Sequence, residues 1–165
     1  MTIYWITGLP GSGKSTLSNV LKEVLNSGSN PIVQLDGDCI RECFMENFGY
    51  SRNERVILGK SYLNLAILIS NQGFDVIVST VSLLDEIHQY IRKLKKIHEI
   101  KVIFINPSIT LLNSRNQKNL RTGLIDNSPG INMEVSFPSQ KNLELSGEED
   151  LDEQIRLLKS IITNE

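Results

Sequence analysis

Cysteines are scarce in this sequence, and so are other features that would place a protein outside the cytoplasm. Among its 165 residues only Cys39 and Cys43 are cysteines, so the chain has no disulfide framework and suits a reducing compartment. The longest apolar run, residues 62–69, is too short to cross a bilayer. Residues 1–8 lack the charged segment and the cleavage site of a signal peptide. We therefore expect a cytoplasmic protein that does not bind membranes.

The sequence also lacks a large excess of charge of either sign. It contains 17 lysines and arginines against 19 aspartates and glutamates, a net charge of −2 at pH 7. That balance lacks the excess of positive charge that is typical of nucleic-acid-binding proteins, so any phosphate must be bound by local donors. Internal repeats and proline- or glycine-rich linkers are missing, and the length suits one domain with a full core. We expect a single domain over residues 1–165.

Short apolar runs alternate along the chain with segments in which apolar residues recur every three to four positions. The runs are typical of buried strands and lie at residues 2–7, 31–35, 75–80, 100–106 and, more weakly, 141–145. The periodic segments predict helices over residues 15–25, 38–47, 54–73, 84–94, 107–117 and 151–162. This alternation favours an α/β fold with a parallel five-stranded sheet flanked by helices on both faces. Such sheets bind ligands at the carboxyl ends of their strands.

The stretch "GLPGSGKST" follows the first strand and opens the first helix, and it satisfies the phosphate-binding pattern G-x-x-x-x-G-K-[ST]. Gly8, Gly11 and Gly13 allow backbone conformations and close approaches that side chains would block. The N–H groups of the loop and of the helix N-terminus attract phosphate oxygens. Lys14 can reach the β- and γ-phosphates of ATP, and the hydroxyl of Ser15 can bind Mg²⁺. The motif predicts a P-loop NTPase fold whose ATP site contains Gly8, Leu9, Pro10, Gly11, Ser12, Gly13, Lys14, Ser15 and Thr16.

Two aspartates follow the second strand in the stretch "LDGDCIR". An acidic residue at a strand end commonly completes the Mg²⁺ site of this fold, which makes Asp36 the candidate metal ligand. Asp38 lies at the expected start of a helix, where it could be an N-cap or could accept a proton from a substrate hydroxyl. Arg41, about one turn further along, would face an anionic substrate.

The stretches "GLPGSGKSTL", "LDGDCIR", "FGYSRNER", "STVS" and "SRNQKNL" occur in the order seen in adenylylsulfate kinases. The chain resembles this family over about its whole length, and D-G-D-x-x-R followed by F/L-G-F/Y-S is the most specific part. Family members transfer the γ-phosphate of ATP to the ribose 3′-hydroxyl of adenylylsulfate. The resemblance therefore implies a kinase that uses Mg²⁺ and ATP. Dimers are common among such proteins, so a homodimer is a further expectation.

The resemblance also implies roles for individual residues. Asp38 would act as a base or orient the acceptor hydroxyl, with Asp36 near Mg²⁺. Arg115 would contribute to ATP binding and catalysis at the start of a lid over about residues 116–140. The residues implied in acceptor binding are Asp38, Arg41, Phe48, Arg55, Ser82 and Lys118.

Several positions depart from the pattern of this family. Asp85 stands where an arginine is expected, Asp126 replaces a lysine of the lid, and Leu58 replaces an asparagine. The two aspartates remove positive charge from a site that would hold a sulfate-bearing nucleotide. The segment "STVSLLDEIHQYIRK" is more similar to a related group that phosphorylates cytidine diphosphoramidate in capsule-sugar modification. The alternatives to an adenylylsulfate kinase-like enzyme are such a kinase and a catalytically inactive nucleotide-binding regulator.

Overall fold

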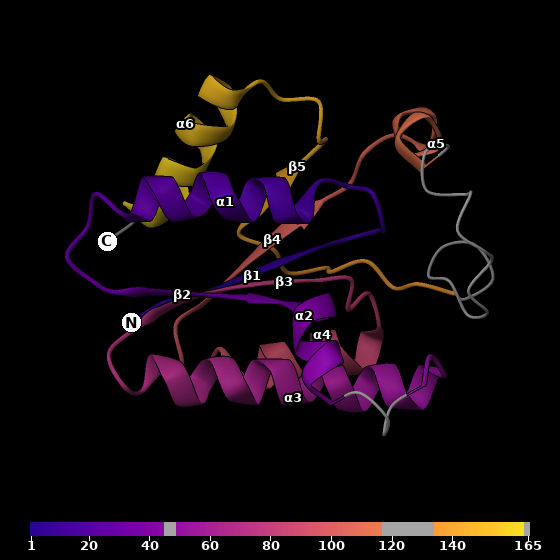
Figure 1. Cartoon of the computed structure of the whole chain (residues 1–165), viewed down its shortest axis with the longest axis horizontal. Helices are drawn as coiled ribbons and strands as arrows, with labels where there is room; N and C mark the ends of the chain where they lie inside the picture. The colour runs from indigo at the N-terminus through magenta and orange to yellow at the C-terminus, as the bar shows by residue number, and fades with distance from the viewer. Residues whose placement is uncertain (45–48, 117–133, 164–165) are drawn as a thin grey trace.

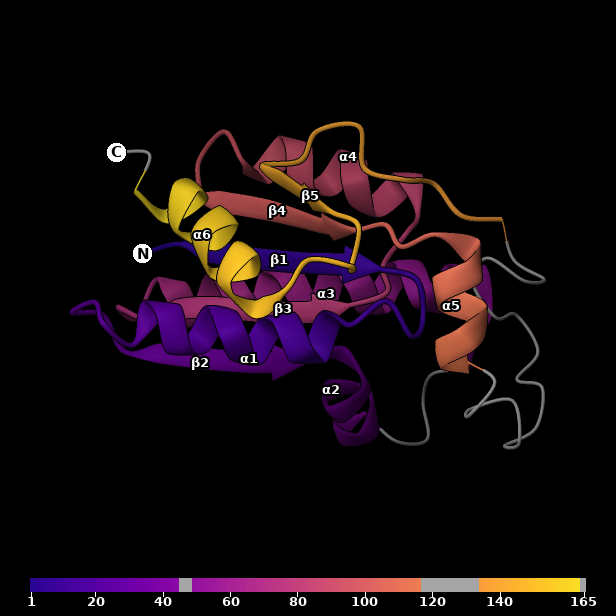
Figure 2. The ribbon, with the colours of Figure 1, turned by 90° about the horizontal axis from the view of Figure 1, so that it is seen from above.

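A parallel β-sheet forms the centre of the computed structural model, which describes residues 1–44, 49–116 and 134–163. The strands are β1 (Ile3–Gly8), β2 (Ile32–Asp36), β3 (Asp75–Thr80), β4 (Ile100–Ile105) and β5 (Leu143–Leu145). They are ordered β2-β3-β1-β4-β5, and every neighbouring pair is parallel. The fold is therefore the expected five-stranded α/β sheet, and all the strands present their carboxyl ends at the same edge (Figure 2).

Helices cover both faces of the sheet (Figure 1). They are α1 (Lys14–Leu25), α2 (Gly37–Cys43), α3 (Arg52–Ser70), α4 (Asp85–Leu94), α5 (Ile109–Asn116) and α6 (Leu151–Ile162). In Figure 1, α1 and α6 lie on one side of the sheet, with α3 and α4 on the other. Helix α5 lies beyond the carboxyl ends of the strands. In the part of the chain that the structure describes, no helix is long and apolar enough to cross a membrane.

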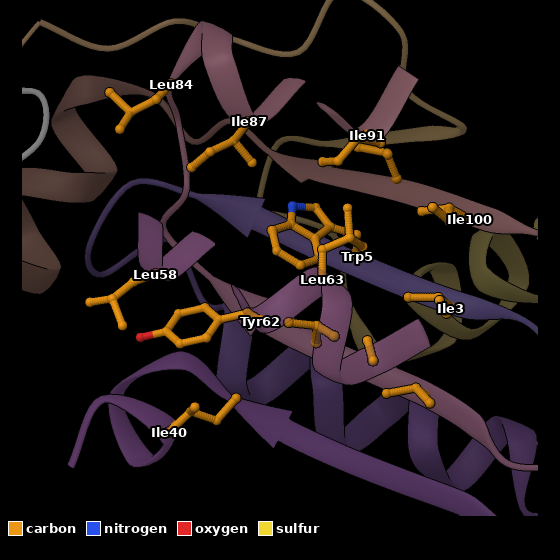
Figure 3. Packing of buried hydrophobic residues seen from close by; sticks show 14 residues of the cluster. Ile3, Trp5, Ile40, Leu58, Tyr62, Leu63, Leu84, Ile87, Ile91 and Ile100 are labelled. Atoms are coloured by element: carbon orange, nitrogen blue, oxygen red, sulfur yellow. The ribbon is translucent and has the colours of Figure 1, made fainter. Parts of the chain in front are cut away.

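The alternating side chains of β1 serve two separate cores, because successive residues of a strand point to opposite faces. Ile3 and Trp5 pack in the cluster formed with α3 and α4, to which Leu63 of α3 also belongs (Figure 3). Tyr4 and Ile6 pack in the second cluster, with residues of α1 and α6. All six residues of β1 are buried, as are those of β3 and β4. This two-sided burial explains why these strands are continuous apolar runs in the sequence.

Helix α3 begins two residues earlier than the apolar periodicity indicated. Ser51 is its N-cap: the backbone N–H of Glu54 donates to Ser51 Oγ over 3.4 Å, and the N–H of Ser51 donates to Glu54 Oε2 over 3.0 Å. This reciprocal capping box satisfies N–H groups that would otherwise lack partners. Helix α2 ends at Cys43, earlier than expected, with Phe44 as its C-cap.

We expect Leu63→Ala to lower the free energy of unfolding by about 2–5 kcal/mol, because it leaves a cavity between α3 and the sheet. Leu63 is fully buried, whereas Leu68 on the same helix is 58% exposed. The matched control Leu68→Ala should change the stability by less than about 0.5 kcal/mol. Urea unfolding followed by circular dichroism measures both effects. Equal losses in the two variants would contradict the packing described for α3.

Candidate active site

A cavity of about 830 Å³ opens at the carboxyl ends of β1, β2 and β3. Its wall contains the loop between β1 and α1, the first turn of α2, part of α3 and the segment that follows β3. On another side it is lined by Arg115, Gly147 and Glu149. The cavity therefore includes the edge at which a sheet of this type binds ligands.

The P-loop needs glycine at two positions for different reasons. A Cβ on Gly8 would lie 2.5 Å from the carbonyl oxygen of Ile105 and 2.7 Å from Ser12 Oγ, so any side chain there would displace β4 or the loop. Gly13 has a φ of 101°, a left-handed conformation that residues with a Cβ rarely adopt. The chain can then turn directly into α1, whose N-terminus faces the cavity.

Lys14 lies across the loop that precedes it. Its Nζ donates to the carbonyl oxygen of Leu9 over 2.9 Å. Burial lowers the pKa of Lys14 to about 8, and the negative charges of Asp38 and Asp36 oppose this shift. Within the described ranges its ammonium group forms no ion pair. Because a desolvated ammonium gains most from a nearby anion, the site is well suited to a phosphate.

The structure corrects the expected capping of α2. Asp36 is the N-cap, since its Oδ1 accepts the backbone N–H of Asp38 over 3.0 Å. Asp38 lies within the first turn and is exposed, and no hydrogen bond reaches its carboxylate from the described part of the chain. The second oxygen of Asp36, Oδ2, accepts from Ser79 Oγ over 2.9 Å and from Ser15 Oγ over 3.3 Å. Capping and metal binding are therefore compatible roles of one aspartate.

Ser15 and Asp36 are chemically suited to Mg²⁺, which prefers oxygen ligands. Their side-chain oxygens lie 3.3 Å apart, close to the ~2.9 Å between neighbouring ligands of an octahedral Mg²⁺ with bonds of about 2.0–2.1 Å. Among the described residues, no group of three or more His, Cys, Asp or Glu side chains could hold a metal. A Mg²⁺ at this site would therefore need phosphate oxygens and water as its remaining ligands, as is usual for kinases.

Two arginines meet around one aromatic ring on the side of α2 and α3. The guanidinium carbon of Arg41 lies 4.5 Å from the ring centroid of Tyr50, and that of Arg55 lies 5.2 Å from it. Arg41 Nη1 donates to the carbonyl oxygen of Gly49 over 2.7 Å, and Arg55 Nε donates to that of Tyr50 over 3.1 Å. Burial and then the charge of Arg41 lower the pKa of Arg55. Two neighbouring cations at a cavity wall form a site for an anionic group.

Two tyrosines belong to this wall, although the sequence analysis did not select them. Tyr50 lies inside the stretch "FGYSRNER", which could have indicated it. The hydroxyl of Tyr62 donates to the carbonyl oxygen of Gly37 over 3.0 Å, and burial raises its pKa. Tyr62 thus joins α3 to the start of α2, between the two aspartates. Only the packing of α3 on α2 reveals this contact, so no pattern in the sequence could have shown it.

Ser82 lines the cavity with an unusual backbone conformation. Its φ is 20°, a positive value, and its Oγ lies 3.0 Å from Thr80 Oγ1. A Cβ on Gly59 would lie 3.2 Å from Ser82 Oγ and 2.4 Å from Ile87 Cδ1. Glycine at position 59 therefore lets α3 approach the segment that follows β3.

Arg115 reaches the P-loop from the last turn of α5. Its Nη1 donates to the carbonyl oxygen of Ser12 over 3.3 Å, and its Nη2 donates to that of Gly147 over 2.8 Å. The carboxylate of Glu149 accepts the N–H groups of Ser146 (2.6 Å) and Gly147 (2.8 Å), which shapes the turn between β5 and α6. No local pattern in the sequence connects this turn with Arg115, because 32 residues separate Arg115 from Gly147.

Some expected site residues cannot be placed. Phe48, Lys118 and Asp126 lie outside the described residues, as does most of the expected lid. The described end of that segment is anchored: the N–H of Ser136 donates to the carbonyl oxygen of Leu83 over 2.9 Å. Asp85 is exposed and accepts a hydrogen bond from Gln89 over 2.6 Å. It does not line the cavity.

Comparisons with known proteins show which family this sequence resembles. A family model described as adenylylsulphate kinase matches residues 1–146. The cytidine diphosphoramidate kinase of Campylobacter jejuni is 35% identical over 162 residues, which cover 94% of this chain and 93% of that protein. The adenylyl-sulfate kinase of Pseudomonas aeruginosa is 30% identical over 169 residues, covering 99% of this chain and 86% of that protein.

A solved structure also resembles this chain over nearly its whole length. It is the APS kinase of Mycobacterium tuberculosis in complex with AMPPNP and APS. The TM-score is 0.85 at 26% sequence identity, and the match covers 98% of this chain and 96% of that one. The P-loop kinase fold expected from the sequence is confirmed.

We expect the binding of ADP at pH 8.5 to be accompanied by proton uptake. Because the pKa of Lys14 is about 8, much of the empty site carries a neutral amine at this pH. Phosphates stabilise the charged form and raise the pKa. Titration calorimetry in two buffers of different ionisation enthalpy measures the uptake. Lys14→Arg is the matched control, since arginine stays charged; the same uptake in this variant would assign the proton to another group.

Proposed function

Since this chain belongs to the adenylylsulphate kinase family, whose members are ATP-dependent kinases, we propose that it transfers the γ-phosphate of ATP to a ribose hydroxyl of a small, anionic, nucleotide-like acceptor. The observation that carries the proposal is the position of Asp38. Asp38 lines the same cavity as Lys14 of the P-loop and Arg55 of α3. A carboxylate between a phosphate site and an anion site suits phosphoryl transfer between them.

The donor half of the proposed site consists of the P-loop, Lys14 and Arg115. The N–H groups of the loop and Lys14 would hold the phosphates of ATP, with Arg115 beside the loop at Ser12. Ser15 and Asp36 would hold Mg²⁺, which would supply positive charge against the negative charge that develops on the phosphates during transfer. Catalysis in this arrangement comes mostly from positioning and electrostatic stabilisation.

The acceptor half would be built on Asp38, Arg41 and Arg55. The exposed carboxylate of Asp38 would orient the attacking hydroxyl or accept its proton. Arg41 and Arg55 would bind the anionic part of the acceptor, and both guanidinium groups pack against the ring of Tyr50, which positions them. Ser82 lines the same cavity and is proposed as a further acceptor contact. We keep Phe48 and Lys118 as proposed acceptor contacts on the resemblance alone.

A specific observation favours cytidine diphosphoramidate over adenylylsulfate as the acceptor. Leu58 contributes an apolar side chain to the cavity wall, at the position where adenylylsulfate kinases carry an asparagine. Leu58 cannot form the hydrogen bonds that an asparagine offers at this position, which weakens the case for adenylylsulfate. The 35% identity to a cytidine diphosphoramidate kinase supports the same choice. The inactive regulator is less well supported, because Lys14, Asp38 and Arg115 all retain positions suited to catalysis.

A panel of acceptors tests the proposal directly. The purified protein is incubated with Mg²⁺, ATP and one acceptor at a time: cytidine diphosphoramidate, adenylylsulfate, CDP or AMP. We expect acceptor-dependent formation of ADP, with the highest kcat/KM for cytidine diphosphoramidate. A higher value for adenylylsulfate would reverse the choice of acceptor. If ADP binds tightly and no acceptor is phosphorylated, the result favours the hypothesis of a catalytically inactive nucleotide-binding regulator.

With the preferred acceptor, Asp38→Asn is expected to lower kcat by about 10²–10⁴-fold, the usual contribution of a general acid or base. The affinity for ADP should change much less than kcat, because Asp38 makes no hydrogen bond to the P-loop in the described structure and acts on Lys14 through its charge. Glu42→Gln is the matched control, since Glu42 is an exposed carboxylate on the same helix. Steady-state kinetics and calorimetry measure both properties. A kcat near that of the unmodified protein in Asp38→Asn would remove Asp38 from this role.

A further inference from the structure

Asp36 receives a hydroxyl hydrogen bond from outside the P-loop and outside its own strand. The parallel register of β2 and β3 pairs Asp36 with Ser79. Ser79 is 4% exposed, and its Oγ donates to Asp36 Oδ2 over 2.9 Å. The hydroxyl of Ser15 approaches the same oxygen at the longer distance of 3.3 Å. Ser79 therefore supplies the shorter of the two hydroxyl contacts to the oxygen that would face Mg²⁺.

The orientation of the Asp36 carboxylate depends on contacts at both of its oxygens. Oδ1 is held by the backbone N–H of Asp38 as the cap of α2, and this contact alone would leave the plane of the carboxylate free to turn. The hydrogen bond from Ser79 to Oδ2 fixes that plane. Hydrogen bonds to an ionised acceptor are short and strong, so the loss of the Ser79 hydroxyl should loosen the carboxylate.

The residue content of β3 supports a role for Ser79 beyond packing. The acidic residue of this strand, Asp75, lies at the opposite end, where it accepts from the N–H of Thr2 and from Asn30 Nδ2. The carboxyl end of β3 contributes hydroxyls, and Ser79 lines the cavity beside Ser15. The carboxylate that would face Mg²⁺, that of Asp36, thus comes from β2, and the hydroxyl that orients it, that of Ser79, comes from β3.

We propose that Ser79 is a positioning residue, which holds the carboxylate of Asp36 in the orientation that receives the Mg²⁺ of Mg·ATP. The inference rests on the proposed function for the use of Mg·ATP, and it does not depend on the acceptor. Partners that orient a metal ligand from the next shell typically contribute 10–100-fold to metal affinity or activity. Removal of the Ser79 hydroxyl should therefore weaken the effect of Mg²⁺ on nucleotide binding by roughly tenfold or more.

The test compares Ser79→Ala with the unmodified protein in the absence of any acceptor. Calorimetry measures the affinity for a non-hydrolysable ATP analogue with Mg²⁺ and with EDTA, and electron paramagnetic resonance measures Mn²⁺ binding to the ADP complex. The ratio of the affinity with Mg²⁺ to the affinity in EDTA measures the metal dependence. We expect this ratio to be lower in Ser79→Ala than in the unmodified protein by about tenfold or more. The affinity measured in EDTA should stay within about twofold of that of the unmodified protein, since among the described residues the Ser79 hydroxyl donates to Asp36 and not to the P-loop.

Two further variants separate positioning from general damage to the fold. Ser79→Thr retains the hydroxyl and should restore the metal-dependent affinity. Ser18→Ala is the matched control: Ser18 is 2% exposed, and its hydroxyl accepts from Gln34 rather than contacting Asp36. It should leave the metal dependence unchanged.

Each outcome bears on one conclusion. Equal metal dependence in Ser79→Ala and the unmodified protein would overturn the role of Ser79 while leaving the proposed kinase activity intact. The same holds if Ser79→Thr fails to restore the effect while Ser79→Ala loses it. An unmodified protein that shows no metal dependence at all would overturn the inference together with the Mg²⁺ site. Failure of every acceptor in the kinase assay would count against the proposed function alone.

Discussion

The hydrogen bonds of the Asp36 carboxylate are the constraint on which the site depends. They join three elements: the start of α1 through Ser15, the end of β3 through Ser79, and the first turn of α2 through the N–H of Asp38. One side chain therefore sets where the phosphate loop lies relative to the acceptor wall. The glycine at position 37 makes the arrangement possible, since a Cβ there would lie 2.9 Å from Thr80 Oγ1.

Charges of both signs line the cavity around this centre. They are the ammonium group of Lys14, the carboxylate of Asp38 and the guanidinium groups of Arg41 and Arg55. Each cation is partly desolvated, which makes an anionic ligand more favourable there than at the protein surface. Tyr62 joins α3 to the start of α2, because its hydroxyl donates to the carbonyl oxygen of Gly37. The carboxylate of Asp38 shares the cavity with these cations, an arrangement that suits the proposed phosphoryl transfer.

Much of the fold could be read from local patterns, and the misses have physical reasons. The strands were found because burial on both faces makes them continuous apolar runs. The start of α3 was misplaced because a capping box of polar residues, Ser51 and Glu54, extends a helix beyond its apolar stripe. The sequence leaves Asp38 open as a cap of α2, because both aspartates suit a cap by residue type. The fold of the chain at Gly37 makes Asp36 the cap.

The sequence by itself determined the α/β class, the P-loop with its lysine and serine, and the candidates Asp36, Asp38, Arg41 and Arg115. These rest on short stretches of chain, in which spacing alone sets which groups can meet. The tertiary structure decided the strand order β2-β3-β1-β4-β5 and the contacts that join distant residues, such as Ser79 to Asp36 and Arg115 to Gly147. Such contacts depend on how strands pair and helices pack, because those interactions bring together residues that no local pattern connects.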